Sequence, residues 1–194
     1  MIDNRLAKIT ACCGLTIGLA ISAQLSQAGN AIGLSYASGF NDVADWHEDN
    51  LFVDRSGIGL GLAYRYIHEF DPNLRLDIGA SYFGTWGDVD YSDLPLQLTI
   101  GYNFAPSGSV NPYIRGGVSY HIMDGDYIEK DADVGVLGAV GIEMGSAVSF
   151  FMELAVDTAE ATFNTEESNS AWTRRYARDE IKISDVMLTL GARF

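Results

Sequence analysis

Cysteine and positive charge are both scarce in this chain, and each scarcity argues against a class of protein. Both cysteines, Cys12 and Cys13, lie in an N-terminal segment that we expect to be removed, so the remainder needs neither disulfide nor thiol chemistry. The chain has 12 Lys and Arg residues against 26 Asp and Glu residues, a formal net charge of -14. Such acidity argues against binding to nucleic acid, whose phosphates require Lys and Arg.

Long apolar runs are absent after Ala28, so no later segment can cross a membrane as a helix. The run from Ile9 to Ala23 is apolar or small, and it follows the basic residues Arg5 and Lys8. This pattern predicts a secretory signal peptide over residues 1–28, cleaved after Ala28, and one mature domain over residues 29–194.

The N-terminal segment has two other interpretations, a membrane anchor helix and a lipoprotein signal. A membrane anchor helix needs about 20 apolar residues, and this run has roughly 15. The residues Ile9–Cys12 resemble a bacterial lipoprotein cleavage box, but the apolar core mostly follows Cys12 instead of preceding it. The signal peptide remains the favoured interpretation.

Proline is scarce as well, with four residues against 21 glycines, which suits β-structure with close backbone packing. The chain after residue 28 alternates between large apolar side chains and small or polar ones. In Ala31–Phe40, for example, Ile32, Leu34 and Tyr36 alternate with Gly, Ser and Ala. Since successive side chains of a strand point to opposite faces, each such segment has one apolar face and one small or polar face.

This alternation predicts eight strands, each close to the roughly 9–11 residues that a tilted membrane strand requires. The segments are Ala31–Phe40, Gly57–Phe70, Leu74–Trp86, Leu94–Phe104, Tyr113–Ile122, Val134–Met144, Val148–Val156 and Val186–Phe194. Short connections at 71–73, 105–112 and 145–147 alternate with long polar ones at 41–56, 87–93, 123–133 and 158–180. An even number of strands with short turns at one end and long loops at the other is typical of outer-membrane barrels.

The sequence therefore predicts an all-β fold, an eight-stranded antiparallel up-and-down transmembrane β-barrel. Aromatic residues near both ends of the segments suit the two lipid interfaces. A soluble barrel with its apolar face inward is the alternative, and the signal peptide and the loop asymmetry favour the membrane. Both termini are then expected in the periplasm and the long loops outside the cell.

Three local motifs carry a family resemblance. Asn111–Tyr120 opens with Pro-Tyr and runs through spaced glycines, Val134–Met144 and Val148–Val156 flank a tight turn, and the chain closes with Leu190-Gly-Ala-Arg-Phe194. They resemble the fifth strand, the sixth-to-seventh hairpin and the closing Gly-Tyr-Arg-Phe of the small eight-stranded bacterial outer-membrane proteins, the class of OmpX, the OmpA transmembrane domain and the opacity proteins. Ala192 stands where Tyr is usual.

The resemblance also implies a role for the last strand. In this class the terminal Phe strand is read by the barrel-assembly machinery, which implies an assembly signal at Leu190, Gly191 and Phe194. We expect loss of Phe194 to impair insertion more than any activity.

The small or polar face carries ions of both signs, which would lie inside the barrel. The expected interior polar cluster is Arg65, Glu69, Arg75, Asp77, Arg115, Glu143, Glu153, Asp185 and Arg193. An eight-stranded barrel is just wide enough to be filled by its side chains, and buried ions must pair to offset desolvation. This predicts a salt-bridged plug, with Glu69, Asp77 or Glu143 as the partner of Arg193. A gated polar pore and a catalytic carboxylate site are the alternatives.

Residues for catalysis, cofactors and metals are not evident. His47 lies in the first loop, His68 is expected to face outward, and His121 is expected to face inward beside Ser119 without an evident third partner. An enzyme needs a nucleophile, a base and an orienting group within reach of one another. No metal-ligand spacing and no phosphate-binding glycine loop occurs, so we expect no catalytic residues, no cofactor and no metal.

The long connections are charged and polar. The acids of the first and third long connections suit plain solvation, bridging of divalent cations to lipopolysaccharide phosphates, or binding of Ca²⁺ through oxygen ligands. No twelve-residue calcium loop is present, which favours solvation. The last connection holds an arginine–aromatic group, the outer-loop cluster, formed by Trp172, Arg174, Arg175, Tyr176 and Arg178. This cluster suits contact with lipid A phosphates or a surface partner, or packing of the loop on itself.

The leading hypothesis is a monomeric, non-enzymatic outer-membrane protein with a plugged interior, serving envelope structure or surface interaction through its outer loops. Its expected partners are outer-membrane lipids and lipopolysaccharide, the barrel-assembly machinery and a surface partner. The rivals are a narrow porin-like channel for small solutes and a lipid-modifying enzyme. The fold alone cannot separate these three functions.

Overall fold

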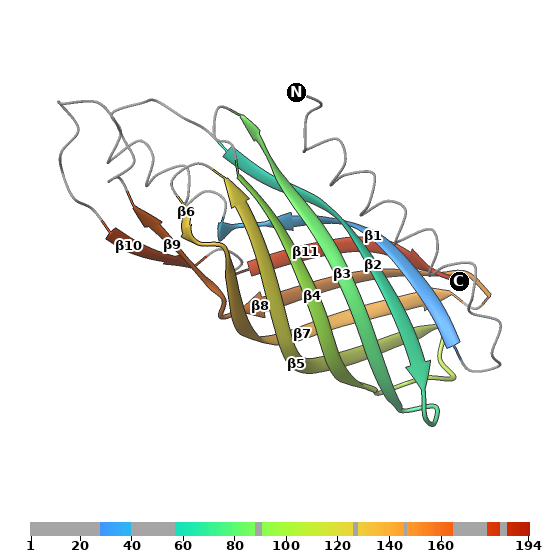
Figure 1. The fold of residues 1–194 in the computed structure, drawn as a ribbon. Helices are drawn as coiled ribbons and strands as arrows, with labels where there is room; N and C mark the ends of the chain where they lie inside the picture. Colours follow the sequence, from blue (N-terminus) through green and yellow to red (C-terminus); the bar gives the residue numbers. More distant parts are fainter. Residues whose placement is uncertain are drawn as a thin grey trace, which may run out of the picture.

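The computed structural model describes residues 28–39, 57–87, 91–125, 128–145, 147–164, 178–182 and 186–194 (Figure 1). The expected signal peptide before Ala28, the first long connection with His47, and Asp185 lie outside the described residues. So do Trp172, Arg174, Arg175 and Tyr176 of the outer-loop cluster. No helix of the described part is long and apolar enough to cross a membrane.

Eight antiparallel strands close into a barrel, which confirms the expected fold class. The strands are β1 Ala28–Ala37, β2 Gly57–Glu69, β3 Leu74–Gly87, β4 Tyr91–Asn103, β5 Val110–Gly125, β7 Ala132–Gly145, β8 Ser149–Asp157 and β11 Val186–Arg193. Each of these eight strands pairs with the one that precedes it and the one that follows it in this list, and β1 pairs with β11 to close the barrel. Closure leaves no unpaired edge among these strands, which a barrel in lipid requires.

The closing seam joins the two ends of the barrel sequence. Residues Ala31 to Ala37 of β1 pair with Arg193 to Met187 of β11. Beyond this register, the Asn30 amide donates to the Phe194 carbonyl at 2.8 Å, and the Phe194 amide donates to the Asn30 carbonyl at 2.8 Å. The backbone of Phe194 therefore completes the seam.

The tight turns and Phe194 lie at the same end of the barrel, and we call this end the turn end. In the β2–β3 turn, Asp71 Oδ1 accepts hydrogen bonds from the amides of Asn73 at 2.8 Å and Leu74 at 2.9 Å. Such an Asx arrangement fixes a short turn locally. At the end of β7, Gly145 has a φ of 129°, a conformation that residues with a Cβ rarely adopt.

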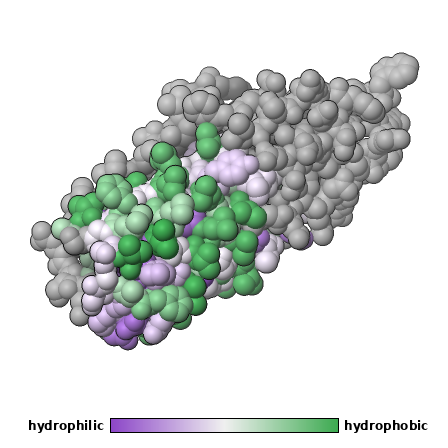
Figure 2. All heavy atoms as spheres, turned by 180° about the vertical axis from the view of Figure 1, so that it is seen from behind, coloured by the Kyte–Doolittle hydropathy of each residue, from purple (hydrophilic) through white to green (hydrophobic). Residues whose placement is uncertain are grey.

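The alternating pattern places apolar side chains outside and polar ones inside. Leu34, Val134 and Phe150 are about two-thirds exposed on the outer surface (68%, 65% and 65%), and apolar side chains cover much of the described surface in Figure 2. Arg75, Asp77 and other ions are buried on the inner face. This is the reverse of a soluble barrel and matches strands that contact lipid.

A second, three-stranded sheet lies at the other end, which we call the loop end (Figure 1). It consists of β6 Ile128–Lys130, β9 Glu160–Asn164 and β10 Arg178–Lys182, in the order β10–β9–β6. The sequence predicted polar connections at 123–133 and 158–180, so the prediction was wrong for these strands. They are only 3 to 5 residues long and pair across two different connections, which leaves little local periodicity to detect.

Candidate functional site

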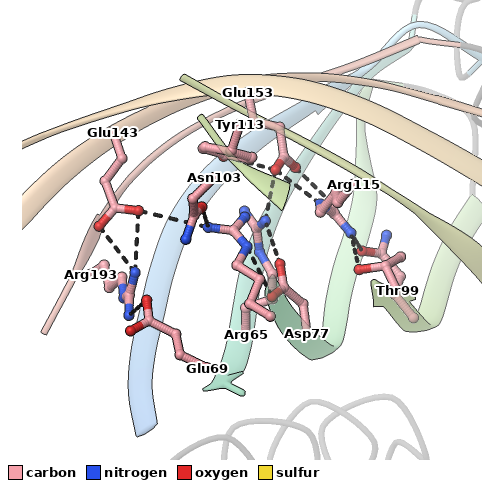
Figure 3. A network of polar contacts seen from close by, with 12 residues as sticks. Arg65, Glu69, Asp77, Thr99, Asn103, Tyr113, Arg115, Glu143, Glu153 and Arg193 are labelled. Carbon is pink, nitrogen blue, oxygen red and sulfur yellow. Dashed lines mark hydrogen bonds and ion pairs between the residues drawn. The ribbon is translucent and has the colours of Figure 1, made fainter. Parts of the chain in front are cut away.

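Glu153 of β8 is the centre of a buried ion network inside the barrel (Figure 3). Its Oε2 accepts hydrogen bonds from Arg65 Nη1 at 2.7 Å, Arg115 Nε at 2.9 Å and the Tyr113 hydroxyl at 2.9 Å. Its Oε1 accepts from Arg115 Nη2 at 2.7 Å. The Glu153 side chain is only 2% exposed, so these charge-assisted bonds replace water for the carboxylate.

Asp77 extends this network from Arg65 of β2 to the neighbouring strand β3. Its carboxylate lies 3.2 Å from Arg75 Nε and 3.6 Å from Arg65 Nη1. The Arg75 guanidinium also stacks on the Tyr113 ring, 4.1 Å from the centroid, and Arg65 lies 5.0 Å from the centroid of Phe151. We call Arg65, Arg75, Asp77, Arg115 and Glu153 the charged layer.

Arg193 lies in a more open position near the turn end. Its Nη2 lies 2.6 Å from Glu69 Oε1, and its Nη1 lies 3.4 Å from Glu143 Oε1. Glu143 also accepts a short hydrogen bond from the Ser149 hydroxyl. Glu69 and Glu143, two of the three partners expected for Arg193, thus contact it, whereas Asp77 pairs with Arg75 and Arg65.

A vestibule of about 530 Å³ opens at this end of the barrel. Glu69, Glu143 and Arg193 line it together with Asn103 and Phe194. Deeper in, the space among Arg65, Arg115, Glu153 and Phe83 shrinks to about 10 Å³. A cavity of that size holds about one water molecule, so the side chains pack closely around Glu153.

An apolar layer adjoins the charged layer on its loop-end side. Phe83, Met123, Leu137 and Met187 are buried there at 0% to 3% exposure, with alanines of β1, β7 and β8 between them. This layer was not predicted from the sequence, because the inward face was expected to be small or polar throughout. The alternation along each strand could have revealed it. Phe83 lies an even number of residues from Asp77 on β3, and Leu137 an even number from Glu143 on β7, so both side chains point inward as those acids do.

His121 lies between two carboxylates near the loop end. Its Nδ1 is 2.8 Å from Asp93 Oδ2, and its Nε2 is 3.3 Å from Asp157 Oδ2. All three side chains are 0% exposed. A third member that the sequence did not reveal is thus present, and it is buried with the other two. The arrangement ties β4, β5 and β8 together.

Asp93 was missed because the strand was expected to begin at Leu94. The alternation of apolar residues weakens before Leu94, but β4 begins at Tyr91 and β5 continues to Gly125. Asp93 therefore pairs with Met123 in the ladder.

His68 was expected to face outward. Its ring is half-buried and makes an edge contact with Phe70, with 5.1 Å between the ring centroids, which agrees with that orientation.

The remaining expected residues fall into two groups. Leu190 and Gly191 lie on β11 in the closing seam. Arg178 begins β10, and its side chain lies outside the described part. Within the described residues, no group of three or more His, Cys, Asp and Glu side chains could hold a metal ion.

A closed antiparallel barrel with an apolar outer band and paired ions inside defines a small transmembrane β-barrel protein. Residues 9–194 match the family described as outer membrane protein beta-barrel domain, and the chain belongs to this family. Its place is therefore the bacterial outer membrane.

Two solved structures share the fold. The outer membrane protein OprG from Pseudomonas aeruginosa matches with a TM-score of 0.60 and 13% identity, covering 86% of this chain and 93% of OprG. Neisserial surface protein A matches with a TM-score of 0.57 and 10% identity, covering 87% of this chain and 96% of that protein. Comparison with curated protein sequences gives no match. At these identities the likeness concerns the fold alone.

Proposed function

We propose that this protein is a closed, non-enzymatic barrel that serves envelope structure or contact with a surface partner through its outer loops. The observation that carries the proposal is the burial of Glu153 between Arg65, Tyr113 and Arg115, which links β2, β5 and β8 across the lumen. The apolar layer supports the proposal, because its side chains offer no hydrogen bonds to a passing ion or polar solute.

The proposed orientation places the turn end in the periplasm and the loop end outside the cell. Short turns on the periplasmic side and longer connections outside are usual for such barrels. In this orientation the β10–β9–β6 sheet faces outward, where lipopolysaccharide or a surface partner could contact it. The protein acts as a monomer and needs no cofactor, and the barrel-assembly machinery is its partner during biogenesis.

Planar-bilayer recording tests the closed barrel. The refolded protein is expected to give no discrete conductance steps, because the charged and apolar layers both fill the lumen. A variant that empties part of both layers (Phe83→Ala, Arg115→Ala and Glu153→Ala together) is expected to conduct and serves as the positive control. Reproducible steps from the unaltered protein would support the channel instead.

Lipid analysis tests the absence of an enzymatic role. Membranes with and without the protein are expected to contain the same lipid A and phospholipid species by mass spectrometry, because His121 and its two carboxylates are inaccessible. A species that depends on the protein and disappears in the His121→Ala variant would establish a lipid-modifying activity.

Phe194→Ala tests the proposed assembly signal. We expect a several-fold lower amount of folded protein in the outer membrane, because the assembly machinery reads the aromatic side chain while the backbone bonds to Asn30 can still form. Phe70→Ala is the matched control, since Phe70 is equally exposed (54% against 52%) at the same end. Equal amounts of the two variants, measured by immunoblotting of membrane fractions, would exclude the signal.

A further inference from the structure

The outer surface carries a groove at the closing seam, near the turn end. The register places Ala192 of β11 directly between Ile32 of β1 and Phe150 of β8. The two larger side chains project from the barrel, with exposed fractions of 42% and 65%, and the short Ala192 side chain leaves a gap between them. The groove has a volume of about 620 Å³, within the roughly 300–1,000 Å³ typical of ligand sites.

The lining of this groove, which we call the Ala192 groove, is wholly apolar. Leu34, Leu190 and Met152 continue it toward the loop end, and Met144 borders it on β7. Gly33 and Gly191, which pair with each other, contribute only backbone to the lining. The wall is therefore thin at this point, and the Phe151 ring supports it from inside.

The position of Phe151 explains why the wall stays closed there. A Cβ on Gly191 would lie 2.6 Å from Phe151 Cε1, and one on Gly33 would lie 3.3 Å from Phe151 Cζ. Phe151 is itself held by the Arg65 guanidinium, 5.0 Å from the ring centroid. The floor of the groove at Gly33 and Gly191 thus rests on Phe151 and, through it, on Arg65 of the charged layer.

We propose that the Ala192 groove binds one acyl chain of a phospholipid. The groove is continuous with the apolar band that faces the membrane, so hydrocarbon chains already surround it. A chain in the groove contacts protein on several sides, whereas a chain on the convex wall contacts it on one, so dispersion attraction favours the groove. A polar occupant finds no hydrogen-bonding side chain in the lining.

A phospholipid is the source that fits the position. The groove lies near the turn end, which the proposed function places at the periplasmic leaflet, and to this extent the inference rests on that proposal. A second barrel fits less well, because its own wall is convex and cannot fill a concave groove. The last alternative occupant is the chain's own segment before Ala28. The measured protein mass shows whether this segment is present.

Native mass spectrometry of protein extracted from membranes in mild detergent tests the inference. The unaltered protein is expected to retain one phospholipid, and Ala192→Phe is expected to reduce the retained fraction at least about tenfold, which corresponds to about 1.4 kcal/mol of binding free energy. The matched control is Val136→Phe, which enlarges a lipid-facing residue of β7 outside the groove and should retain the lipid. Circular dichroism confirms that each variant is folded, and Ala192→Leu provides a smaller filler.

Several outcomes would overturn the inference. Equal phospholipid retention by the unaltered protein and both groove variants, or loss of lipid from Val136→Phe as well, would show that the groove is not the binding site. Retention of lipid A, a dimer that Ala192→Phe dissociates, or a mass that includes residues 1–28 would each identify a different occupant. The proposed function fails separately. Discrete conductance from a barrel that retains phospholipid would contradict the closed lumen and leave the lipid site intact.

Discussion

Replacing Glu153 by leucine is expected to destabilise the barrel by about 3–5 kcal/mol, the usual cost of removing one partner of a buried ion pair. The variant leaves Arg115 with only the neutral side chains of Gln97 and Thr99, at 3.3 Å each, and leaves Arg65 with Asp77 at 3.6 Å. Two buried guanidinium groups then share too little negative charge. Equilibrium unfolding in urea, with the protein refolded into lipid vesicles, measures the change in free energy.

The control for this prediction is a charge removed from a solvated position. Asp131→Asn, at an exposed position between β6 and β7, is expected to change the free energy of unfolding by less than about 0.5 kcal/mol. The double variant Glu153→Leu with Arg115→Leu should recover part of the loss, because it also removes one unpaired cation. A Glu153→Leu barrel as stable as the Asp131→Asn barrel would show that the charged layer does not hold the fold together.

Gly117→Ala is expected to destabilise the barrel by about 1–3 kcal/mol or prevent its closure, because the inner face of β5 has no room for a methyl group. The added Cβ would lie 2.1 Å from the Leu98 carbonyl oxygen and 2.7 Å from the Thr99 Cα. Both are backbone atoms of the neighbouring strand β4, so no side-chain rotation can relieve the contact. The same urea titration, together with refolding yield, measures the effect.

The preceding residue supplies a matched control. Gly116 faces the other side of the same strand, and the nearest atom to its added Cβ is the Leu137 carbonyl oxygen at 3.6 Å, an ordinary contact. Gly116→Ala is therefore expected to change the free energy of unfolding by less than about 0.5 kcal/mol. Similar behaviour of the two variants would contradict the close approach of β4 and β5 at Gly117.

The strands and their faces could be predicted from the sequence because both depend on neighbouring residues. Alternation with period two decides which side chains share a face, and this holds however the strands are later paired. Arg65, Asp77 and Glu153 were therefore assigned to the interior before any contact was known. The alternation weakens at Tyr91–Asp93, and the predicted strand begins three residues later than β4 does. It is also weak in β6, β9 and β10, where polar connections were predicted instead of strands.

The partners inside the barrel depend on closure, which no local pattern encodes. Arg65 and Glu153 are 88 residues apart, and Arg115 and Glu153 are 38 residues apart. These side chains meet only because eight strands wrap around a narrow lumen with one particular stagger. The carboxylates that hold His121 were beyond the sequence for the same reason, since they come from β4 and β8 while His121 is on β5.

The sequence by itself determined a membrane barrel with ions inside and apolar residues outside, because alternation and charge are properties of single strands. Only the tertiary structure decided that those ions pair in one layer around Glu153, that an apolar layer adjoins it, and that Ala192 leaves a groove at the seam. Each of these features arises where side chains of different strands come together, and the register of the closed barrel sets which ones meet.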